Sequence, residues 1–328
     1  MIPKMKSFVL GTGSYLPARV LTNSELETMV ETSDEWITTR TGIKTRHIAG
    51  HGEETSVLAV EASKKALAMA GLAPGDIDLI LVGTISSEVA MPSCACLVQK
   101  ELGALNAFAY DLNAACCGFL YALDMADAYL HRDPKMNILV IGAETLSSRT
   151  NWQDRNTCIL FGDGAGACIV SGAGRDNGML ASKLYSDGNL YKLLYMDSAK
   201  GMNPDLRNAG NQGSYIKMTG RDVFKHAVRA MSGAVTELLA AEGIKLDDVK
   251  LFIPHQANLR ILNSLLERLN IPTEKAYVNM TKYGNTSAAS IPIALDEANR
   301  AGRLSKGDLV LLCAFGGGFT WGAAILRW

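Results

Sequence analysis

The chain has 328 residues, of which 48% are hydrophobic and 20% charged, so it has enough apolar side chains for one large core or two medium ones. Its 32 basic and 33 acidic residues nearly cancel, which removes any whole-chain reason to expect binding to nucleic acid or to an anionic membrane. The cysteine count is odd, no apolar run is long enough to cross a bilayer, and the first residues lack a secretory signal, so we expect a reduced, cytoplasmic protein.

Short aliphatic runs alternate along the chain with segments of helical periodicity. In chain order the pattern predicts a helix in "TSVLAVEASKKALAMAG" (55–71), strands in "LILVGT" (79–84) and "AFAYDLN" (107–113), a helix in "GFLYALDMADAYL" (118–130), strands in "ILVIGAE" (138–144) and "LFIP" (251–254), and a helix in "ANLRILNSLLERL" (257–269). Such alternation favours a mainly parallel, buried sheet covered by helices.

The chain resembles itself when it is shifted by 172 residues, so that Gly71 falls on Gly243. In that register "GLAPGDIDLILV" aligns with "GIKLDDVKLFIP", "NAACCGFLYALDMAD" with "NTSAASIPIALDEAN", and "MNILVIGAE" with "DLVLLCAFG". Three matches in one register predict two duplicated α/β halves, which we place at 1–174 and 175–328. The alternative is that these matches reflect only the general similarity of any two α/β segments. Residues 173–220 are rich in Gly, Ser, Asp and Asn, and we expect them to contain the junction between the two halves and a segment that extends over the surface.

Two adjacent cysteines, Cys116 and Cys117, lie between the strand that ends near Asn113 and the helix from Gly118. A thiol at such a turn meets unpaired backbone N–H groups and the positive end of the helix dipole. The dipole contributes only about 0.3–1 kcal/mol, less than one pKa unit, so a nucleophilic Cys116 needs a second polar partner. The alternative is that both cysteines are small core residues.

Two polar residues follow strand ends or turns in the second half. Pro254 halts the strand "LFIP", so His255 should emerge at its tip, and Asn285 in "KYGNTSAAS" falls on Asn113 in the repeat register. Pseudo-symmetry would bring the two helix starts, and hence Cys116 and Asn285, toward a shared centre. Taken singly, a His or an Asn is more often a capping or hydrogen-bonding residue, but together at equivalent positions these residues favour a catalytic cluster.

Four motifs, "AACCGFLYAL", "IPHQANLRI", "YGNTSAASIP" and "AFGGGFTWGAAILRW", closely resemble those of the β-ketoacyl-acyl carrier protein synthase III family of thiolase-fold condensing enzymes. The resemblance runs the whole length and includes "TSDEWITTRTGIKTRHIA" and "FGDGAGA". It implies an α/β thiolase fold of two duplicated halves, with mixed, mainly parallel buried sheets in a layered αβαβα arrangement. It also implies a homodimeric acyltransferase that condenses an acyl-CoA primer, acetyl-CoA or a short or branched acyl-CoA, with malonyl-acyl carrier protein. The products would be 3-oxoacyl-acyl carrier protein, CoA and CO2, and the reaction would initiate type II fatty acid synthesis.

By this resemblance, Cys116 is the acylated nucleophile, and His255 and Asn285 bind the carbonyl oxygen of the malonyl thioester. Decarboxylation builds negative charge on that oxygen, and two neutral donors can bind it without a proton transfer. A second oxyanion hole is required at the Cys116 carbonyl, for which the backbone N–H groups of Cys116 and Gly317 are suited because glycine lets the backbone approach closely. Cys117 takes a position that is commonly Ala in the family, which leaves the choice of nucleophile unchanged.

The resemblance also implies binding residues. Trp36, Arg40 and Arg155 would hold the adenine and phosphates of CoA. The acidic carrier protein needs a basic docking rim, for which the candidates are Arg260 and Arg268 on one helix face and Lys225; an ordinary solvated face is the alternative.

Met91 occupies the position of a Phe that, in many family members, reaches across the dimer to close the partner's acyl pocket. Because Met is flexible, we expect the pocket to accept acetyl-CoA and to tolerate somewhat longer or branched primers.

Competing motif interpretations are weaker. "GTGSYL" from Gly11 and "GDGAGA" from Gly162 are fragments of dinucleotide loops that we expect to be turns, and no spacing suggests a metal. No cofactor is expected, because acyl-CoA is a substrate. A thiolase would need a second cysteine beside the glycine run, but Cys313 is one residue off that pattern, and the C-G-x-C-W context of papain is absent. A condensing enzyme of specialised metabolism and a non-catalytic thiolase-fold binding protein stay open as alternatives.

Overall fold

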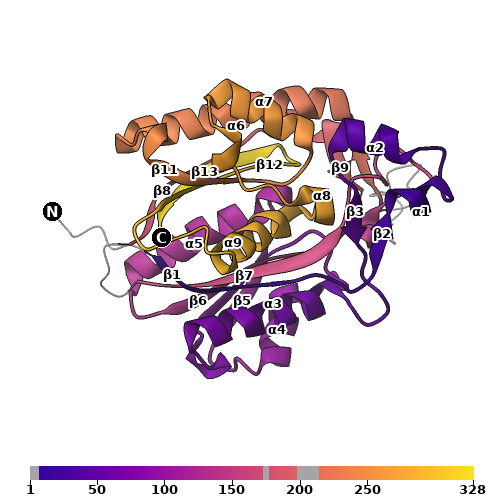
Figure 1. Ribbon diagram of the computed structural model, residues 1–328. Coiled ribbons are helices and arrows are strands. Elements are labelled where there is room, and N and C mark those ends of the chain that lie inside the picture. The colour runs from indigo at the N-terminus through magenta and orange to yellow at the C-terminus, as the bar shows by residue number, and fades with distance from the viewer. Residues whose placement is uncertain (1–6, 173–176, 198–213) are drawn as a thin grey trace.

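The computed structural model describes residues 7–172, 177–197 and 214–328. Two sheets stack with helices between them and on both outer faces, which makes five layers (Figure 1). The first sheet has the strand order β1 (Phe8–Tyr15), β7 (Asp163–Ser171), β6 (Asn137–Thr145), β4 (Leu79–Gly83), β5 (Phe108–Leu112), and the second β11 (Val249–Pro254), β12 (Leu309–Gly316), β13 (Thr320–Arg327), β8 (Gly178–Ser186). The αβαβα arrangement expected from the sequence is therefore confirmed.

The helices divide among three of these layers. The middle layer contains α5 (Gly118–Arg132) and α9 (Ser290–Arg300), while one outer face carries α3 (Thr55–Ala70) and α4 (Cys94–Leu102) and the other carries α6 (Gly220–Glu242) and α7 (Leu259–Leu269). Smaller elements gather at one end: α1 (Asn23–Glu27), α2 (Asp34–Thr41), α8 (Met280–Tyr283), and the strand pairs β2 (Val20–Thr22) with β3 (Thr45–His47) and β9 (Leu194–Met196) with β10 (Ile216–Met218).

Parallel pairing does not predominate in the two large sheets, which corrects one part of the expected fold. Strand β4 runs parallel to β5 and β6, and β11 runs parallel to β12, but β7 and β13 are antiparallel to both of their neighbours. Helices cover both faces of each sheet, so antiparallel strands such as β7 are as fully buried as parallel ones. A continuous apolar run therefore indicates burial here and not strand direction.

The internal duplication is visible in the topology. The order β1-β7-β6-β4 of the first sheet is repeated as β8-β13-β12-β11 in the second. Strand β6 begins at Asn137 and β12 at Leu309, which is the 172-residue shift found in the sequence. The helices α3 and α6 both end at a left-handed glycine, Gly71 and Gly243. The expected boundary between residues 174 and 175 lies outside the described residues and stays a prediction.

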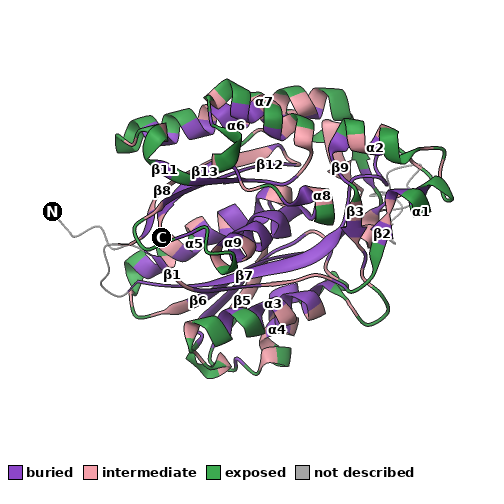
Figure 2. Ribbon diagram, in the orientation of Figure 1, coloured by how far each residue is buried: buried purple, intermediate pink, exposed green. Residues whose placement is uncertain are grey.

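The two halves share the middle layer. Helix α9 is mostly buried, whereas α5 buries one face and exposes residues toward its C-terminal end, and the outer helices also present an exposed face (Figure 2). One core cluster joins Phe119 of α5 and Ile291 of α9 to Val140 in the first sheet and Leu312 in the second. Among the described residues, no helix is long and apolar enough to span a bilayer.

The two glycine-rich fragments that were expected to be turns lie within strands instead. "GTGSYL" belongs to β1 and most of "GDGAGA" to β7. A Cβ atom on Gly13 would stand 2.2 Å from the carbonyl oxygen of Ala62 in α3. These glycines therefore allow a helix to pack closely on a strand. The expectation of turns from the sequence missed this role.

Candidate active site

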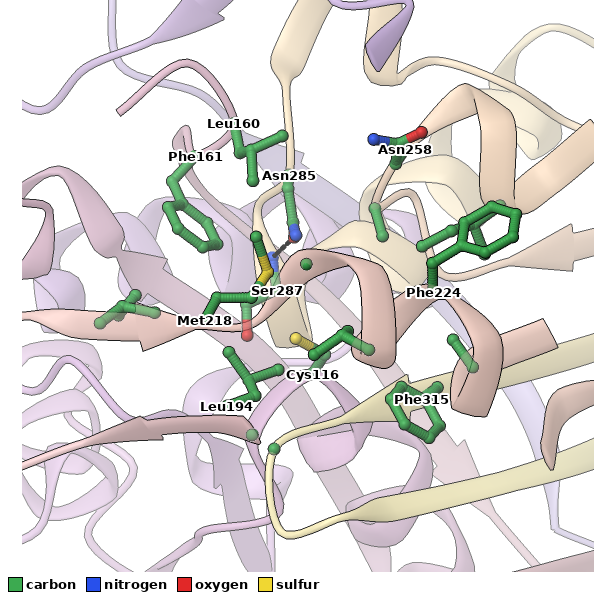
Figure 3. Close-up of a pocket in the computed structure, with 18 of the residues that line it drawn as sticks. Cys116, Leu160, Phe161, Leu194, Met218, Phe224, Asn258, Asn285, Ser287 and Phe315 are labelled. Carbon is green, nitrogen blue, oxygen red and sulfur yellow. Dashed lines mark hydrogen bonds between the residues drawn. The ribbon is translucent and has the colours of Figure 1, made fainter. Parts of the chain in front are cut away.

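Cys116 lies in the short 3-10 turn of residues 115–117, between β5 and α5, as the sequence predicted. It is half-buried and lines a cavity of about 1110 Å³ (Figure 3). Cys117 is fully buried in the core, and its thiol donates to the backbone carbonyl of Thr320 at 3.3 Å. The two adjacent cysteines thus face different environments, and only Cys116 is open to the cavity.

His255 and Asn285 line the same cavity. His255 directly follows β11, and its backbone N–H donates to the carbonyl of Cys313 at 2.7 Å. Asn285 precedes the 3-10 turn of residues 287–289 that leads into α9, so it holds the position in its half that Asn113 holds before α5. The structure therefore brings together the three residues that the sequence placed at related strand and turn ends.

Hydrogen bonds determine which nitrogen of His255 carries its proton. The Ser290 hydroxyl lies 2.7 Å from Nδ1 and also accepts the backbone N–H of Gln256 at 3.3 Å. Among the described residues, Nδ1 is the only acceptor that meets this hydroxyl, so Ser290 donates to Nδ1 and the proton of the neutral ring is on Nε2. Burial lowers the pKa of His255 to about 4, which keeps the ring neutral. His255 therefore offers an N–H donor to the cavity.

The amide of Asn285 is fixed in the same manner. Its Oδ1 accepts the backbone N–H of Ser287 at 2.9 Å, and its backbone N–H donates to the carbonyl of Leu160 at 2.8 Å. Because the oxygen is held by the chain itself, the Nδ2 group is left to face the cavity, where no described residue accepts from it. Asn285 thus supplies a second neutral donor.

The environment of Cys116 disfavours its thiolate. Burial raises the pKa of Cys116 to about 11, and the negative charge of Glu144 adds to that effect. The neighbouring Ser287 side chain opposes the shift, as does the backbone N–H of Cys116 itself. The helix start alone does not activate this thiol, in agreement with the small dipole contribution expected from the sequence.

The glycine run after β12 packs directly against the nucleophile. A Cβ atom on Gly316 would lie 2.7 Å from the backbone nitrogen of Cys116 and 3.1 Å from its Cβ atom, so no larger residue fits there. Gly317, the next residue, lines the cavity beside Cys116. This close approach is the reason why the run needs glycine, and it sets a second backbone segment against the sulfur.

Comparison with known proteins now adds to this geometry. The family described as 3-oxoacyl-[acyl-carrier-protein] synthase III matches residues 110–188, and its C-terminal counterpart matches residues 239–328. The β-ketoacyl-[acyl-carrier-protein] synthase III of Desulfotalea psychrophila is 56% identical over 99% of this chain and all of its own. The chain belongs to the β-ketoacyl-[acyl-carrier-protein] synthase III family. It is an acyltransferase of the condensing type, which initiates fatty acid synthesis.

Solved structures agree in fold. The synthase III of Aquifex aeolicus superposes with a TM-score of 0.92 at 50% identity, covering 98% of this chain and all of its own. A priming β-ketosynthase from a polyketide biosynthetic pathway superposes with a TM-score of 0.90 at 36% identity, covering 99% and 98%. The thiolase fold of the synthase III family is therefore the fold of this chain.

The residues that the family resemblance assigned to CoA meet at one end of the cavity. Trp36 and Arg40, both in α2, line it, and the Arg40 guanidinium lies 4.5 Å from the Trp36 ring centroid. Arg155 lies outside the lining, but its guanidinium is 5.2 Å from the same centroid and it donates to the backbone carbonyl of Glu31. The three side chains therefore form one cluster around an indole ring.

The remaining candidates divide into two groups. Arg260 and Lys225 line the cavity from α7 and α6. Arg268, at the far end of α7, is exposed and does not line it. Met91 is 86% exposed and does not line the cavity.

Sequence reasoning missed three polar residues around the site: Ser287, Ser290 and Glu144. Ser287 and Ser290 are ordinary residues for a helix start. Only their closeness to Asn285 in the sequence could have indicated that they belong to the site. Glu144 carried a signal, because a carboxylate ending the apolar run "ILVIGAE" is unexpected in a buried strand. Among the described residues, no group of three or more His, Cys, Asp and Glu side chains is arranged to hold a metal ion.

Proposed function

We propose that the chain condenses an acyl-CoA primer with malonyl-acyl carrier protein, releasing CoA and CO2 and forming a 3-oxoacyl-acyl carrier protein. The observation that carries this proposal is that Cys116, His255 and Asn285 line one cavity, with hydrogen bonds fixing the His255 ring and the Asn285 amide. That set suits a reaction in which a thioester is held on sulfur while an enolate forms nearby.

In the first half-reaction, the sulfur of Cys116 attacks the thioester carbon of the primer. The bond between that carbon and the CoA sulfur breaks, and the acyl group stays on Cys116 as a thioester of similar energy. The backbone N–H groups of Cys116 and Gly317 bind the oxyanion of the tetrahedral intermediate. The close packing of Gly316 on Cys116 holds those two backbone segments together.

In the second half-reaction, the malonyl group loses CO2 and its thioester oxygen becomes an enolate oxygen. His255 Nε2–H and Asn285 Nδ2–H bind that oxygen, and each such donor is worth about 10²–10³ in rate. The enolate carbon attacks the acyl carbon on Cys116, the carbon–sulfur bond breaks, and the extended chain leaves on the carrier protein.

The mouth of the cavity suits the two substrates. The indole and guanidinium groups of Trp36, Arg40 and Arg155 offer stacking and charged hydrogen bonds to an adenine nucleotide. Arg260 and Lys225 present positive charge at the same mouth, where an acidic carrier protein would deliver its thioester. Arg268, which stands apart, is the weaker docking candidate.

A homodimer is part of the proposal. Strand β5 pairs with β4 on one side only and forms an edge of the first sheet among the described residues. Large apolar side chains are exposed close to it in sequence, including Phe108 on the strand and Leu105 before it, which is 82% exposed. An uncovered apolar edge is suited to pairing with a second copy. Such pairing would also bring Met91 toward the partner's pocket.

Primary fatty acid synthesis is favoured over specialised metabolism by the degree of similarity. The chain is 56% identical to a synthase III but 36% identical to the priming ketosynthase of a polyketide pathway. The intact set of Cys116, His255 and Asn285 argues against a non-catalytic binding protein.

The proposal is tested by incubating the chain with acetyl-CoA and locating the acyl group by peptide mass spectrometry. We expect one acyl group on Cys116, release of CoA, and further turnover only when malonyl-acyl carrier protein is added. Cys117→Ala is the matched control and should be acylated like the wild type, because the Cys117 thiol faces the core. An acyl group on Cys117, or none on the chain with any short acyl-CoA, would contradict the proposal.

A further inference from the structure

A fully buried carboxylate, Glu144, lies behind the cavity and takes no part in the steps above. Its Oε2 accepts hydrogen bonds from the Thr84 and Ser86 hydroxyls and from the Ile85 backbone N–H. Its Oε1 accepts from the Ser287 hydroxyl at 3.0 Å. No lysine or arginine pairs with it among the described residues. Burial, the largest cause, raises the pKa of Glu144 to about 7, so the group can change its proton near neutral pH.

Ser287 connects this carboxylate to the nucleophile. Its side chain interacts with Cys116 on one side and donates a hydrogen bond to Glu144 on the other. Figure 3 shows Cys116 and Ser287 close together among the residues that line the pocket. The single hydroxyl proton of Ser287 is directed to Glu144, so its oxygen is left to accept a proton from the neighbouring Cys116 thiol.

His255 is poorly placed to take the thiol proton. Its Nδ1 accepts from Ser290 and its Nε2 already carries a proton, so a further proton would make a buried imidazolium. The pKa of His255, about 4, shows how strongly burial disfavours that cation. His255 is therefore not the acceptor of the Cys116 proton, and Glu144 is the nearby carboxylate that can take it.

We propose, building on the proposed acyl transfer, that Ser287 and Glu144 form a relay that takes the Cys116 thiol proton during acylation and returns it after condensation. As the sulfur bonds to the acyl carbon, the thiol proton moves to Ser287 Oγ and the Ser287 hydroxyl proton moves to Glu144 Oε1. CoA leaves as a thiolate, which takes a proton from water. When the enolate later displaces Cys116, the same two protons move back and the thiol is restored. One proton from water is consumed in the cycle.

Other titratable groups near the relay do not substitute for it. Cys117 lies behind Cys116 and bonds to Thr320. Cys94 of α4 feels the charge of Glu144 and also those of Asp111 and Glu88, and burial raises its pKa well above the usual value. Both are buried thiols and cannot accept a proton in their neutral form.

The relay is tested by the pH dependence of acylation in a single turnover with acetyl-CoA, without carrier protein, followed by intact-protein mass spectrometry. In the wild type the rate should rise with pH as Glu144 loses its proton, at a pKa of about 7, and then level off. Ser287→Ala and Glu144→Gln should each lower the rate at neutral pH by roughly 10²-fold and remove that inflection.

The design separates chemistry from folding. Position 287 has a positive φ of 49°, but Ala115 holds the same left-handed conformation at the equivalent point of the first half, with φ of 46°, so alanine is tolerated there. Asn285 keeps its partner in Ser287→Ala, because that partner is a backbone N–H. The relay variants should lose much less of CO2 release from malonyl-acyl carrier protein than of acylation, since CO2 release uses His255 and Asn285.

Each outcome has one meaning. If Ser287→Ala and Glu144→Gln are acylated with the wild-type rate and pH profile, the relay is wrong and the proposed function stands. If the wild type itself is not acylated on Cys116, the proposed function fails instead. If the variants lose acylation and CO2 release together, the two residues only support the shape of the site, and the relay is refuted.

Discussion

His255 and Asn285 are each fixed by a hydrogen bond on the side away from the cavity. Ser290 holds Nδ1 of the ring, and the backbone N–H of Ser287 holds Oδ1 of the amide. The groups that remain for a ligand are donors, and neither carries a charge at neutral pH. Pre-positioned neutral dipoles stabilise an enolate without reorganising during the reaction.

His255→Ala and Asn285→Ala should therefore each lower CO2 release from malonyl-acyl carrier protein by about 10²–10³-fold. Acylation of Cys116 by acetyl-CoA should persist in both variants, because neither donor is needed for it. Asn113→Ala is a suitable control, since Asn113 lines the same cavity at the repeat-related position. CO2 release at the wild-type rate from both variants would show that the donors are misassigned.

The protonation state of His255 determines how we expect decarboxylation to depend on pH. The pKa of His255 is lowered to about 4, so its N–H donor keeps one protonation state from about pH 5 upward. The ring gains a charge only as the pH falls through that value. CO2 release measured from about pH 5.5 to about pH 9 should therefore show no inflection from His255, unlike the acylation step. An inflection near pH 6.5 that disappears in His255→Ala would contradict this expectation.

The sequence revealed the reactive residues but not their supports. Cys116, His255 and Asn285 could be found because each follows a recognisable strand or turn end, and the repeat places two of them in equivalent positions. Ser287 and Glu144 meet only because the end of β6 packs against the start of α9, more than 140 residues later in the chain. No local pattern encodes such a contact, so a lone serine and a lone glutamate could not be paired from the sequence.

At the scale of the elements, α7 offers an internal comparison for carrier-protein docking. Arg260 stands at its first turn and lines the cavity, whereas Arg268 stands at its last turn, about 12 Å farther along the axis. The sequence treated both as candidates because both lie on one exposed face. The structure distinguishes them by their distance from the cavity.

Arg260→Glu should raise the concentration of malonyl-acyl carrier protein needed for half-maximal rate by roughly tenfold at low salt, with a smaller difference at high salt. Arg268→Glu should have a weaker effect. Self-acylation by acetyl-CoA should change little in either variant, because it does not involve the carrier. A larger effect at Arg268 than at Arg260 would move the docking surface away from the cavity.

Strand direction is the part of the fold that the sequence did not yield. The strands, the helix starts and the duplication were readable from apolar runs, helical periodicity and self-similarity. Strands β7 and β13 read as buried runs like their parallel neighbours, because helices cover both faces of each sheet. Direction depends on which connection each strand follows, and a burial pattern contains no information about it.

At the scale of the whole molecule, Met91 makes the proposed dimer testable. It is exposed in the single chain, so it can influence primer choice only in a neighbouring subunit. Met91→Phe should narrow the range of accepted acyl-CoA primers, since a rigid ring moves aside less readily than a flexible thioether.

Mixed dimers decide which subunit is affected. One dimer pairs Cys116→Ala with Met91→Phe, so that its single active site faces an unaltered Met91; it should keep the wild-type primer range. The other pairs a wild-type subunit with one that carries both changes, and it should show the narrowed range. The reverse result would place Met91 in its own subunit's pocket, and equal ranges would remove it from the pocket altogether.

The burial of α5 and α9 between the two sheets has a consequence for hydrogen exchange. The buried residues of both helices belong to a core that joins the two halves, so we expect the backbone amides of these residues to exchange with solvent mainly when the whole molecule unfolds. The outer helices α3, α4, α6 and α7 have one face in water and can open locally at a lower free-energy cost. Cys116 and Asn285 both stand just before the buried first turns of α5 and α9, so we expect their relative position to persist through motions that loosen the outer helices.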